Sequence, residues 1–323
     1  MKRIIFRCNA TFKSGLGHFS RCLNIARGII SIQPGSEIKF HGIYSQFALQ
    51  ELNRFGFTHQ EMREEDQWKK EINTALAKHA DIFILDTYEA DRTFANEIAD
   101  HKTRIIVLDD FFQYDDRSID LLINFRLDAT QLIMPNSERA LGTHFFPCKP
   151  ELLLCRKANR EEFAHHSALI MLGASADPAF THRITSIVSK LLPDFTLHSV
   201  SSSAPTAVAN NVRYHAYVTE IEKMYTSVDL VIHGGGLAKY ESAFCFVPNI
   251  SIDATPLSRQ DTEAFFRTGL SLDGSCQYEF DEQKLKIALN AFRNERWRAN
   301  FKAACEDLFS NDSLRNLAQR ILD

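Results

Sequence analysis

Short apolar runs alternate with longer amphipathic stretches along most of the chain, and this alternation predicts the fold. Stretches such as residues 18–32 and 91–101 carry the spacing of an amphipathic helix. The runs at 82–85 and 105–108 are continuously apolar, which is typical of strands covered on both faces, as in a parallel sheet. Strands and helices that alternate in this way predict an α/β fold. The expected strands are residues 2–9, 37–44, 81–86, 104–109 and 121–124, and, after a break, 167–172, 195–201, 212–218, 229–233 and 249–253.

A break near residues 150–162 divides this pattern into two halves. Two prolines and a charged stretch interrupt the alternation there, and it restarts at residue 167. We therefore expect two Rossmann-like lobes that face each other across a cleft, with residues 1–152 in the first and 153–323 in the second. The end of the chain reads as helical, and its last helix could pack back on the first lobe.

Composition removes several classes of protein. The formal net charge of -4 gives no basic excess that would attract nucleic acid or an anionic membrane. No apolar run approaches the roughly 18 residues that a membrane span requires. The 7 cysteines are scattered without a C-x-x-C pair, which argues against a disulfide framework and against a zinc site. We expect a cytoplasmic protein that uses no metal and no cofactor.

Three consecutive glycines, Gly234, Gly235 and Gly236, stand between a predicted strand and a predicted helix. Glycine lets the backbone approach a ligand closely, and the start of a helix offers free N–H groups and a positive dipole end. This combination suits a diphosphate, and the carboxylate of Glu241 could accept hydrogen bonds from ribose hydroxyls. A tight turn that binds no ligand is the alternative.

A second glycine loop contains Gly15 and Gly17 and leads directly into His18. It lacks the third glycine of a dinucleotide fingerprint and the Gly-Lys-Ser/Thr of a P-loop. A helix N-terminus favours a neutral imidazole that can accept a proton, so we interpret His18 as a candidate general base. Arg21 lies on the same face of the predicted helix and could bind an anion or cover the helix surface.

Two further turns carry polar groups that could contact a ligand or only shape the backbone. Gly173 and Ser175 follow the first strand of the second lobe, where Ser175 or Asp177 could cap the next helix. Asp109 and Asp110 end a buried strand and could contact a sugar hydroxyl. A turn or cap role for these two residues is the alternative.

Taken together, these segments resemble the hydrolases of pseudaminic acid biosynthesis, which act on UDP-2,4-diacetamido-2,4,6-trideoxy-β-L-altropyranose. Those enzymes belong to the GT-B superfamily and are relatives of MurG. The resemblance covers nearly the whole chain. The matching positions are 6–7, 15–18, 21–23, 85–86, 88, 108–110, 121–124, 172–173, 175, 177–178, 231–232, 235–236, 240–241, 247–248 and 260.

The resemblance implies a GT-B architecture and a role for each matched position. His18 would activate water against the anomeric carbon and Tyr88 would lie near the sugar. The expected reaction is C–O cleavage with inversion and release of UDP, without a metal. The positions implied to bind nucleotide or substrate are Gly15, Gly17, Arg21, Gly173, Ser175, Gly235, Gly236, Glu241 and Gln260.

Several positions depart from the pattern of that family. Asn9 stands where the family has Asp, Thr87 where it has His, and Arg259 where it has Asn. His233 and Lys239 are also unusual in the glycine segment. Lys239 and Arg259 could suit an additional phosphate or could be surface residues, so the substrate of this chain can differ from that of the family.

Two other functions remain open. A glycosyltransferase would use the same donor pocket for a UDP- or CMP-linked sugar in the assembly of surface polysaccharide or flagellin glycan. His18 would then deprotonate an acceptor hydroxyl, and a lipid acceptor would bring the protein into peripheral contact with a membrane. The third possibility is a non-catalytic binding protein in polysaccharide assembly. The sequence does not predict an oligomeric state.

Overall fold

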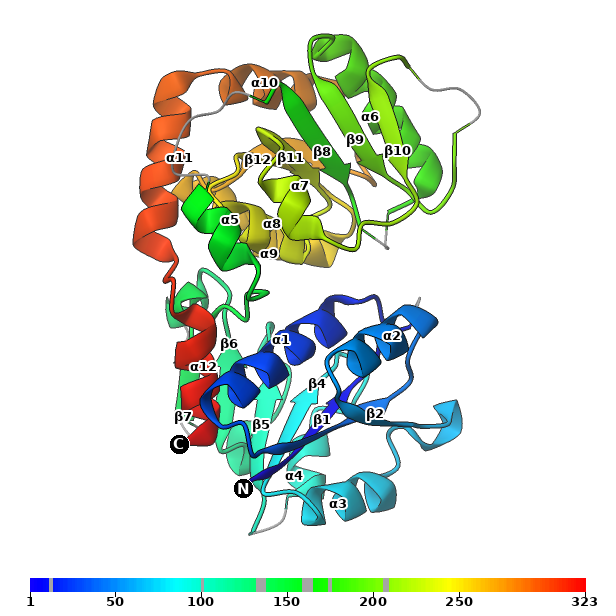
Figure 1. Ribbon diagram of the computed structural model, residues 1–323, viewed down its shortest axis with the longest axis vertical. Helices are drawn as coiled ribbons and strands as arrows, with labels where there is room; N and C mark the ends of the chain where they lie inside the picture. The colour runs from blue at the N-terminus through cyan, green and yellow to red at the C-terminus, as the bar shows by residue number, and fades with distance from the viewer. Residues whose placement is uncertain (12–13, 100–101, 132–137, 159–164, 174–175, 206–208) are drawn as a thin grey trace. The chain divides into compact units, whose positions relative to one another are not determined.

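The computed structural model describes residues 1–11, 14–99, 102–131, 138–158, 165–173, 176–205 and 209–323. The chain forms two compact units, which consist of residues 1–150 with 310–323, and of residues 151–309. Each unit is a parallel β-sheet with helices packed against it, so the predicted α/β fold with two Rossmann-like units is confirmed (Figure 1). Among the described helices, none is both long and apolar enough to cross a membrane.

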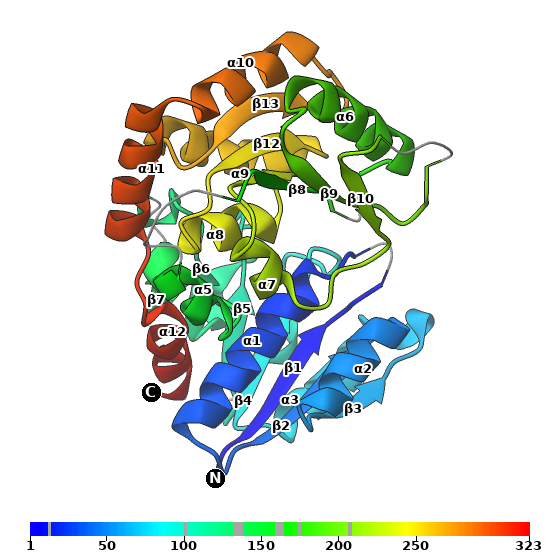
Figure 2. The same cartoon turned by 45° about the horizontal axis from the view of Figure 1, so that its top comes forward.

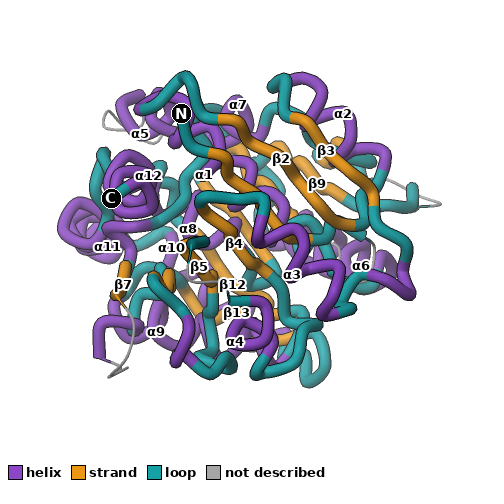
Figure 3. Tube along the Cα trace, turned by 90° about the horizontal axis from the view of Figure 1, so that it is seen from below, coloured by secondary structure: helices purple, strands orange, loops and turns teal. Residues whose placement is uncertain are grey.

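The first unit is built on a seven-stranded sheet in the order β3-β2-β1-β4-β5-β6-β7, and its strands are drawn in orange in Figure 3. Side chains alternate between the two faces. Ile4 and Phe6 pack with α1, α2 and α12, whereas Ile5 packs on the opposite face with α3 and α4. The strands are β1 (Arg3–Cys8), β2 (Glu37–Gly42), β3 (Thr58–Glu61), β4 (Ile82–Asp86), β5 (Arg104–Leu108), β6 (Leu121–Asn124) and β7 (Glu138–Leu141). The α-helices are α1 (Gly17–Ile32), α2 (Gln46–Arg54), α3 (Lys70–Lys78), α4 (Phe94–Ile98) and α12 (Ser313–Leu322), and the 3₁₀ turns are η1 (Glu64–Asp66), η2 (Asp116–Ser118), η3 (Ala129–Gln131) and η4 (Thr143–Phe145).

The C-terminal helix α12 belongs to the first unit and lies beside α1 (Figure 2). Leu317 and Ile321 of α12 share an apolar cluster with Ile25 of α1. Gly28 permits this close packing, because a Cβ there would lie 3.0 Å from Leu314 of α12. Side chains of the last helix and of the first strand therefore belong to the same apolar core.

The second unit is built on a six-stranded sheet in the order β10-β9-β8-β11-β12-β13. Its apolar core lies between the sheet and the helices α6 and α10, while α8 and α9 also contact strands of the sheet. The strands are β8 (Ser167–Met171), β9 (Thr196–Val200), β10 (Val212–His215), β11 (Leu230–His233), β12 (Asn249–Asp253) and β13 (Leu272–Cys276). The helices are α5 (Leu152–Ala158), α6 (Pro178–Leu191), α7 (Ile221–Tyr225), α8 (Leu237–Phe244), α9 (Pro256–Thr268), α10 (Glu282–Phe292) and α11 (Glu295–Leu308).

In both units the strand order reverses next to the strand that starts the sheet. The reversal lies between β1 and β4 in the first unit and between β8 and β11 in the second. Open parallel sheets bind ligands at the carboxyl ends of strands at this position. His18 follows β1, and the three glycines follow β11. Each unit therefore carries one of the predicted sites at the edge where such sheets bind ligands.

Candidate functional site

His18 is the second residue of α1, directly after the predicted glycine turn. Gly15 has a φ of 70°, a left-handed conformation that glycine adopts readily, and α1 begins at Gly17. Nδ1 of His18 lies 2.5 Å from Oδ1 of Asp86, the last residue of β4. A neutral imidazole that donates from Nδ1 keeps its lone pair on Nε2. Asp86 therefore holds His18 in the tautomer that can accept a proton at Nε2.

Arg21 connects two buried carboxylates beneath His18. Its Nε and Nη2 each donate to an oxygen of Asp86 at 2.6 Å, and its Nη1 donates to Asp110 at 2.6 Å. Burial alone would raise the pKa of Asp86, but the charges of Arg21 and His18 outweigh it and lower that pKa. The side chain of Arg21 is only 4% exposed. The sequence suggested that Arg21 could bind an anion or cover the helix surface; in the structure its guanidinium binds two carboxylates of the protein.

Tyr88 is the exposed member of this cluster. Its hydroxyl donates to Asp110, and its ring meets the imidazole of His18 edge-on with the centroids 4.4 Å apart. The ring also packs against Phe111, with the centroids 5.6 Å apart. Since Tyr88 is 39% exposed, it offers an accessible aromatic surface next to the candidate base.

Two carboxylates, Asp86 and Asp110, bind the single guanidinium of Arg21, and the imidazole of His18 stands beside Asp86. A carboxylate in this position orients the imidazole and stabilises the imidazolium that forms when the base acts.

The two consecutive aspartates after β5 have different roles. Asp109 accepts hydrogen bonds from the amides of Phe111 and Tyr114 at 3.2 and 2.9 Å, so it forms the turn. Asp110 instead binds Arg21. Sequence reasoning gave Asp110 a possible sugar contact or a turn role and matched Asp86 to the family pattern, but it assigned neither carboxylate a bond to Arg21 or His18. Both stand at or just after the carboxyl end of a continuously apolar strand, which is the signal that marks them in the sequence.

The three glycines of the second unit differ in their surroundings. A Cβ at Gly234 would lie 1.9 Å from the carbonyl oxygen of Leu172, and one at Gly235 would lie 2.2 Å from Oδ1 of Asp253. Gly236 is exposed, and a Cβ there would meet nothing within 4 Å. The first two glycines are therefore required by packing, whereas the third leaves the backbone open to a ligand.

His233 holds the glycine loop from the interior. Its Nδ1 accepts the amide of Gly235 at 3.1 Å, and its Nε2 donates to Oδ1 of Asn249 at 3.0 Å. The amide of Gly235 is therefore bound within the protein. The amides that follow, from Gly236 into α8, stand in the first turn, where a helix provides no intrahelical acceptor.

Glu241 lies in the second turn of α8 and is oriented by a buried tyrosine. Its Oε2 accepts a hydrogen bond from the hydroxyl of Tyr225 at 3.0 Å. Burial, followed by the charge of Glu241, raises the pKa of Tyr225, so the phenol stays a donor. This bond fixes the direction of the carboxylate that the sequence suggested for ribose.

The two unusual cations of the second unit are both engaged by carboxylates. Lys239 is fully buried and its Nζ lies 2.5 Å from Asp261, so the alternative of a surface residue is wrong for it. Arg259 makes two bonds to Asp273, at 2.7 and 2.8 Å, and one to Glu263 at 3.1 Å. These partners leave neither cation as a simple anchor for an additional phosphate.

The remaining predicted positions are distributed as follows. Gly173 follows β8 with a φ of 87° and is exposed, as is Gln260 on α9. Gly17 is exposed at the start of α1. Ser175 lies outside the described residues. Among the described residues, no three His, Cys, Asp or Glu side chains gather as metal ligands.

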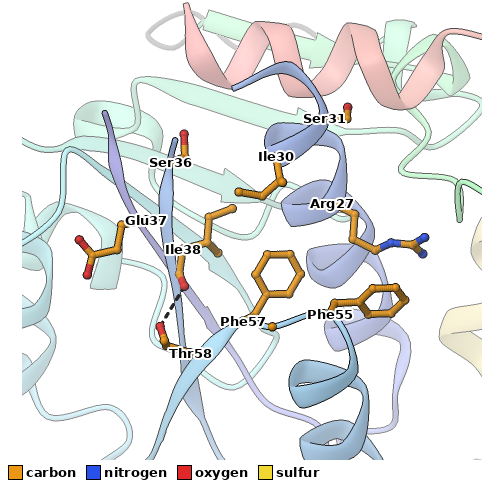
Figure 4. Close-up of a pocket in the computed structure, with 10 residues that line it drawn as sticks. Arg27, Ile30, Ser31, Ser36, Glu37, Ile38, Phe55, Phe57 and Thr58 are labelled. Atoms are coloured by element: carbon orange, nitrogen blue, oxygen red, sulfur yellow. Dashed lines mark hydrogen bonds between the residues drawn. The ribbon is translucent and has the colours of Figure 1, made fainter. Parts of the chain in front are cut away.

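A cavity of about 580 Å³ lies in the first unit, between the last turns of α1, the start of β2 and the segment from α2 to β3 (Figure 4). Ile30, Ile38 and Phe57 contribute apolar surface to it, with Arg27 and Glu37 also in the lining. The cavity thus lies at the amino ends of β2 and β3 and at the end of α1, whereas Asp86 ends β4 and His18 follows the carboxyl end of β1. The cavity is therefore separate from the His18 cluster.

Protonation of His233 should make folding sensitive to acid. Burial, aided by the charge of Lys239, lowers the pKa of His233 to about 3 from an ordinary value of 6.5. Between these values the unfolded chain binds a proton that the folded chain does not, so stability falls as the pH decreases from 6.5 to about 3. One such histidine contributes up to ~1.4 kcal/mol per pH unit.

Urea unfolding at several pH values checks this expectation. His233→Gln should lose less stability between pH 6.5 and 4.5 than the parent protein. His41, whose pKa burial lowers to about 4, provides a second variant with the same direction of change. An identical pH slope in the parent and in His233→Gln would contradict the assignment.

No protein family profile matches the sequence, and no curated protein matches it. Solved structures do match over the whole chain. The spinosyn forosaminyltransferase SpnP is 14% identical with a TM-score of 0.68, and the match covers 100% of each chain. LpCGTa, solved in complex with UDP, is 11% identical with a TM-score of 0.70 and the same coverage. MurG of Acinetobacter baumannii is 11% identical with a TM-score of 0.67, and the match covers 100% of this chain and 99% of MurG. At these identities the similarity establishes the fold, which is that of the GT-B glycosyltransferases.

Proposed function

We propose that this protein is a glycosyltransferase that uses a nucleoside diphosphate sugar as donor. The observation that carries the proposal is the pair of His18 and Asp86, a base oriented by a buried carboxylate at the ligand-binding edge of a parallel sheet. The second unit supplies the nucleotide site through Gly236 and Glu241. The similarity to a structure named as a forosaminyltransferase supports transfer over hydrolysis, and the similar structure of LpCGTa holds UDP.

In the proposed reaction, Nε2 of His18 removes the proton of an acceptor hydroxyl as its oxygen attacks the anomeric carbon. The bond between that carbon and the oxygen of the diphosphate breaks, and the nucleoside diphosphate leaves with the bonding electrons. Attack from the face opposite the leaving group inverts the anomeric configuration. Asp86 stabilises the imidazolium, and the amides that begin α8 stabilise the negative charge on the diphosphate.

A second candidate is hydrolysis of a UDP-linked deoxy amino sugar, as in the biosynthesis of pseudaminic-type acids. The contact between His18 and Tyr88 favours it, because the family resemblance assigns these two residues to the base and the sugar. Water would replace the acceptor hydroxyl, and the remaining steps would be the same. The scattered cysteines suit a reducing cytoplasm, where we place either activity.

A ligand screen followed by turnover measurements tests the proposal. Thermal shifts with UDP, CMP, GDP and dTDP should show stabilisation by a nucleoside diphosphate. Release of that diphosphate from the matching nucleotide sugar should then depend on an added acceptor. Release without an acceptor would favour the hydrolase. Binding without either reaction would indicate a non-catalytic protein, and no binding of any nucleotide would overturn the proposal.

Replacement of Glu241 tests the nucleotide site. Glu241→Ala should weaken binding of the preferred nucleoside diphosphate by roughly 1.5–3 kcal/mol, the range for hydrogen bonds to a charged group. Tyr225→Phe should cost less, about 0.5–1.5 kcal/mol, because it only releases the orientation of the carboxylate. Isothermal titration calorimetry measures both, and Glu279→Ala, at an exposed position of the same unit, is the control. Unchanged affinity in Glu241→Ala would show that the ribose lies elsewhere.

A further inference from the structure

Lys239 is a fully buried cation directly beneath the glycine loop. Its Nζ lies 2.5 Å from the carbonyl oxygen of Gly235, 2.5 Å from Oδ2 of Asp261 and 3.5 Å from Oγ1 of Thr262. Removing an ammonium from water is costly even when it is paired, and an apolar side chain of similar size would fill the same volume at less cost. The bond to the loop carbonyl distinguishes this lysine from a residue that only fills space.

The bond from Lys239 sets the direction of the next amide. The carbonyl of Gly235 and the N–H of Gly236 belong to one peptide group, and no cis peptide bond is present among the described residues. In a trans peptide these two groups point in opposite directions. Because the carbonyl points to a fully buried ammonium, the N–H of Gly236 points away from the interior. In this orientation residue 235 has a φ of 84°, a left-handed conformation that glycine adopts readily.

The same bond makes that amide a stronger donor. A positive charge on the carbonyl oxygen draws electron density through the peptide group, and hydrogen bonds linked in this way strengthen one another. Lys239 also adds a positive charge within the first turn of α8, where the helix dipole already favours an anion. Asp261 offsets part of this charge, and the hydroxyl of Tyr240 donates to that carboxylate at 3.0 Å.

We propose that Lys239 is a positioning residue for diphosphate binding, which aims and polarises the amide of Gly236 through the carbonyl of Gly235. The inference rests on the proposed function, because it requires the second unit to bind a nucleoside diphosphate. It also explains why Asp261 accompanies the lysine, because a buried ammonium needs a carboxylate beside it whether or not a diphosphate is bound.

Two substitutions with opposite expected effects test this role. Lys239→Met keeps the length of the side chain but removes its charge, and should weaken binding of the preferred nucleoside diphosphate and of inorganic pyrophosphate on the order of tenfold. The affinity for the corresponding nucleoside should stay unchanged. Asp261→Asn removes the charge of the carboxylate 2.5 Å from the ammonium, and this variant should bind pyrophosphate at least as tightly as the parent protein.

A merely structural role would give a different result, since both variants would then lose affinity for nucleoside and diphosphate alike. Either that result or wild-type diphosphate affinity in Lys239→Met would overturn the inference. A parent protein that binds no nucleoside diphosphate would instead overturn the proposed function.

Glycine-selective ¹⁵N labelling adds a spectroscopic measurement that does not depend on the ligand. The chain contains 13 glycines, and Gly236→Ala identifies the resonance of interest by its loss. The amide proton of Gly236 should move upfield in Lys239→Met, because the peptide group is less polarised. An unchanged shift would contradict the inference.

Discussion

His18→Ala should lower kcat by about 10²–10⁴-fold, the usual contribution of general acid–base catalysis. Nucleotide affinity should stay nearly constant, because the diphosphate and ribose contacts proposed for the second unit do not involve this side chain. The alanine leaves Asp86 and Arg21 paired with each other through two bonds of 2.6 Å, so the fold of the first unit should persist. Turnover assays and calorimetry on the same preparation separate the two effects.

Asp86→Asn is the companion variant. Its amide group can donate to Nδ1 of His18 and would then favour the tautomer with a proton on Nε2, which cannot act as a base. Since the two residues act as a unit, the double variant should be little slower than His18→Ala alone. Nearly normal turnover in His18→Ala would exclude the assignment of His18 as the general base.

Gly234→Ala should destabilise the second unit by more than the ~1–3 kcal/mol typical of overpacking in a core. The added Cβ would lie 1.9 Å from the carbonyl oxygen of Leu172, a backbone atom directly after β8 that cannot rotate away as a side chain could. The central strands β8 and β11 would have to separate at their carboxyl ends. Denaturant unfolding followed by circular dichroism measures the loss.

Gly236→Ala is the matched control, because the same methyl group meets nothing within 4 Å there. Its φ of -81° is also accessible to alanine, so its stability should change by less than about 1 kcal/mol. Its affinity for a nucleoside diphosphate should nevertheless fall, since the methyl group would obstruct the approach of the ligand to the amide. Equal stability losses in the two variants would show that the glycine loop does not pack as described.

The central strands and the positions of the glycine turns follow from the amino-acid pattern, because their physical cause is local. The strand at Ile82–Asp86 must be apolar at successive positions since helices cover both faces of the sheet, and such a run is visible in the sequence. The start of α1 at Gly17 and of α8 at Leu237 likewise follows from glycines next to helical spacing. The prediction of two α/β halves was therefore correct.

The edge strands could not be predicted from the sequence, because they form only beside a neighbouring strand of the folded sheet. The strands β3, with the sequence THQE, and β7, with ERAL, carry polar side chains, so no apolar run marks them. They form because a neighbouring strand offers backbone groups for pairing, as Gly42 does for Glu61. The strand β13, with the sequence LDGSC, includes Gly274 and shifts register against β12. Its residues therefore also lack the apolar run that predicts a strand. The helix expected at 91–101 is limited to Phe94–Ile98 among the described residues.

Residue types and chain order were enough to identify His18, the glycine loop and Glu241 as candidates, because glycine turns and helix starts are properties of adjacent residues. The partners of these residues depend on the order of strands in space. Asp86 lies 68 residues from His18 in the chain and meets it only because β4 pairs with β1. In the same way, the sequence leaves Lys239 open as a ligand for an additional phosphate or as a surface residue, and the packing of α8 against its sheet buries it beside Asp261. Charge pairing and burial act through distance in space, which the linear order of residues does not contain.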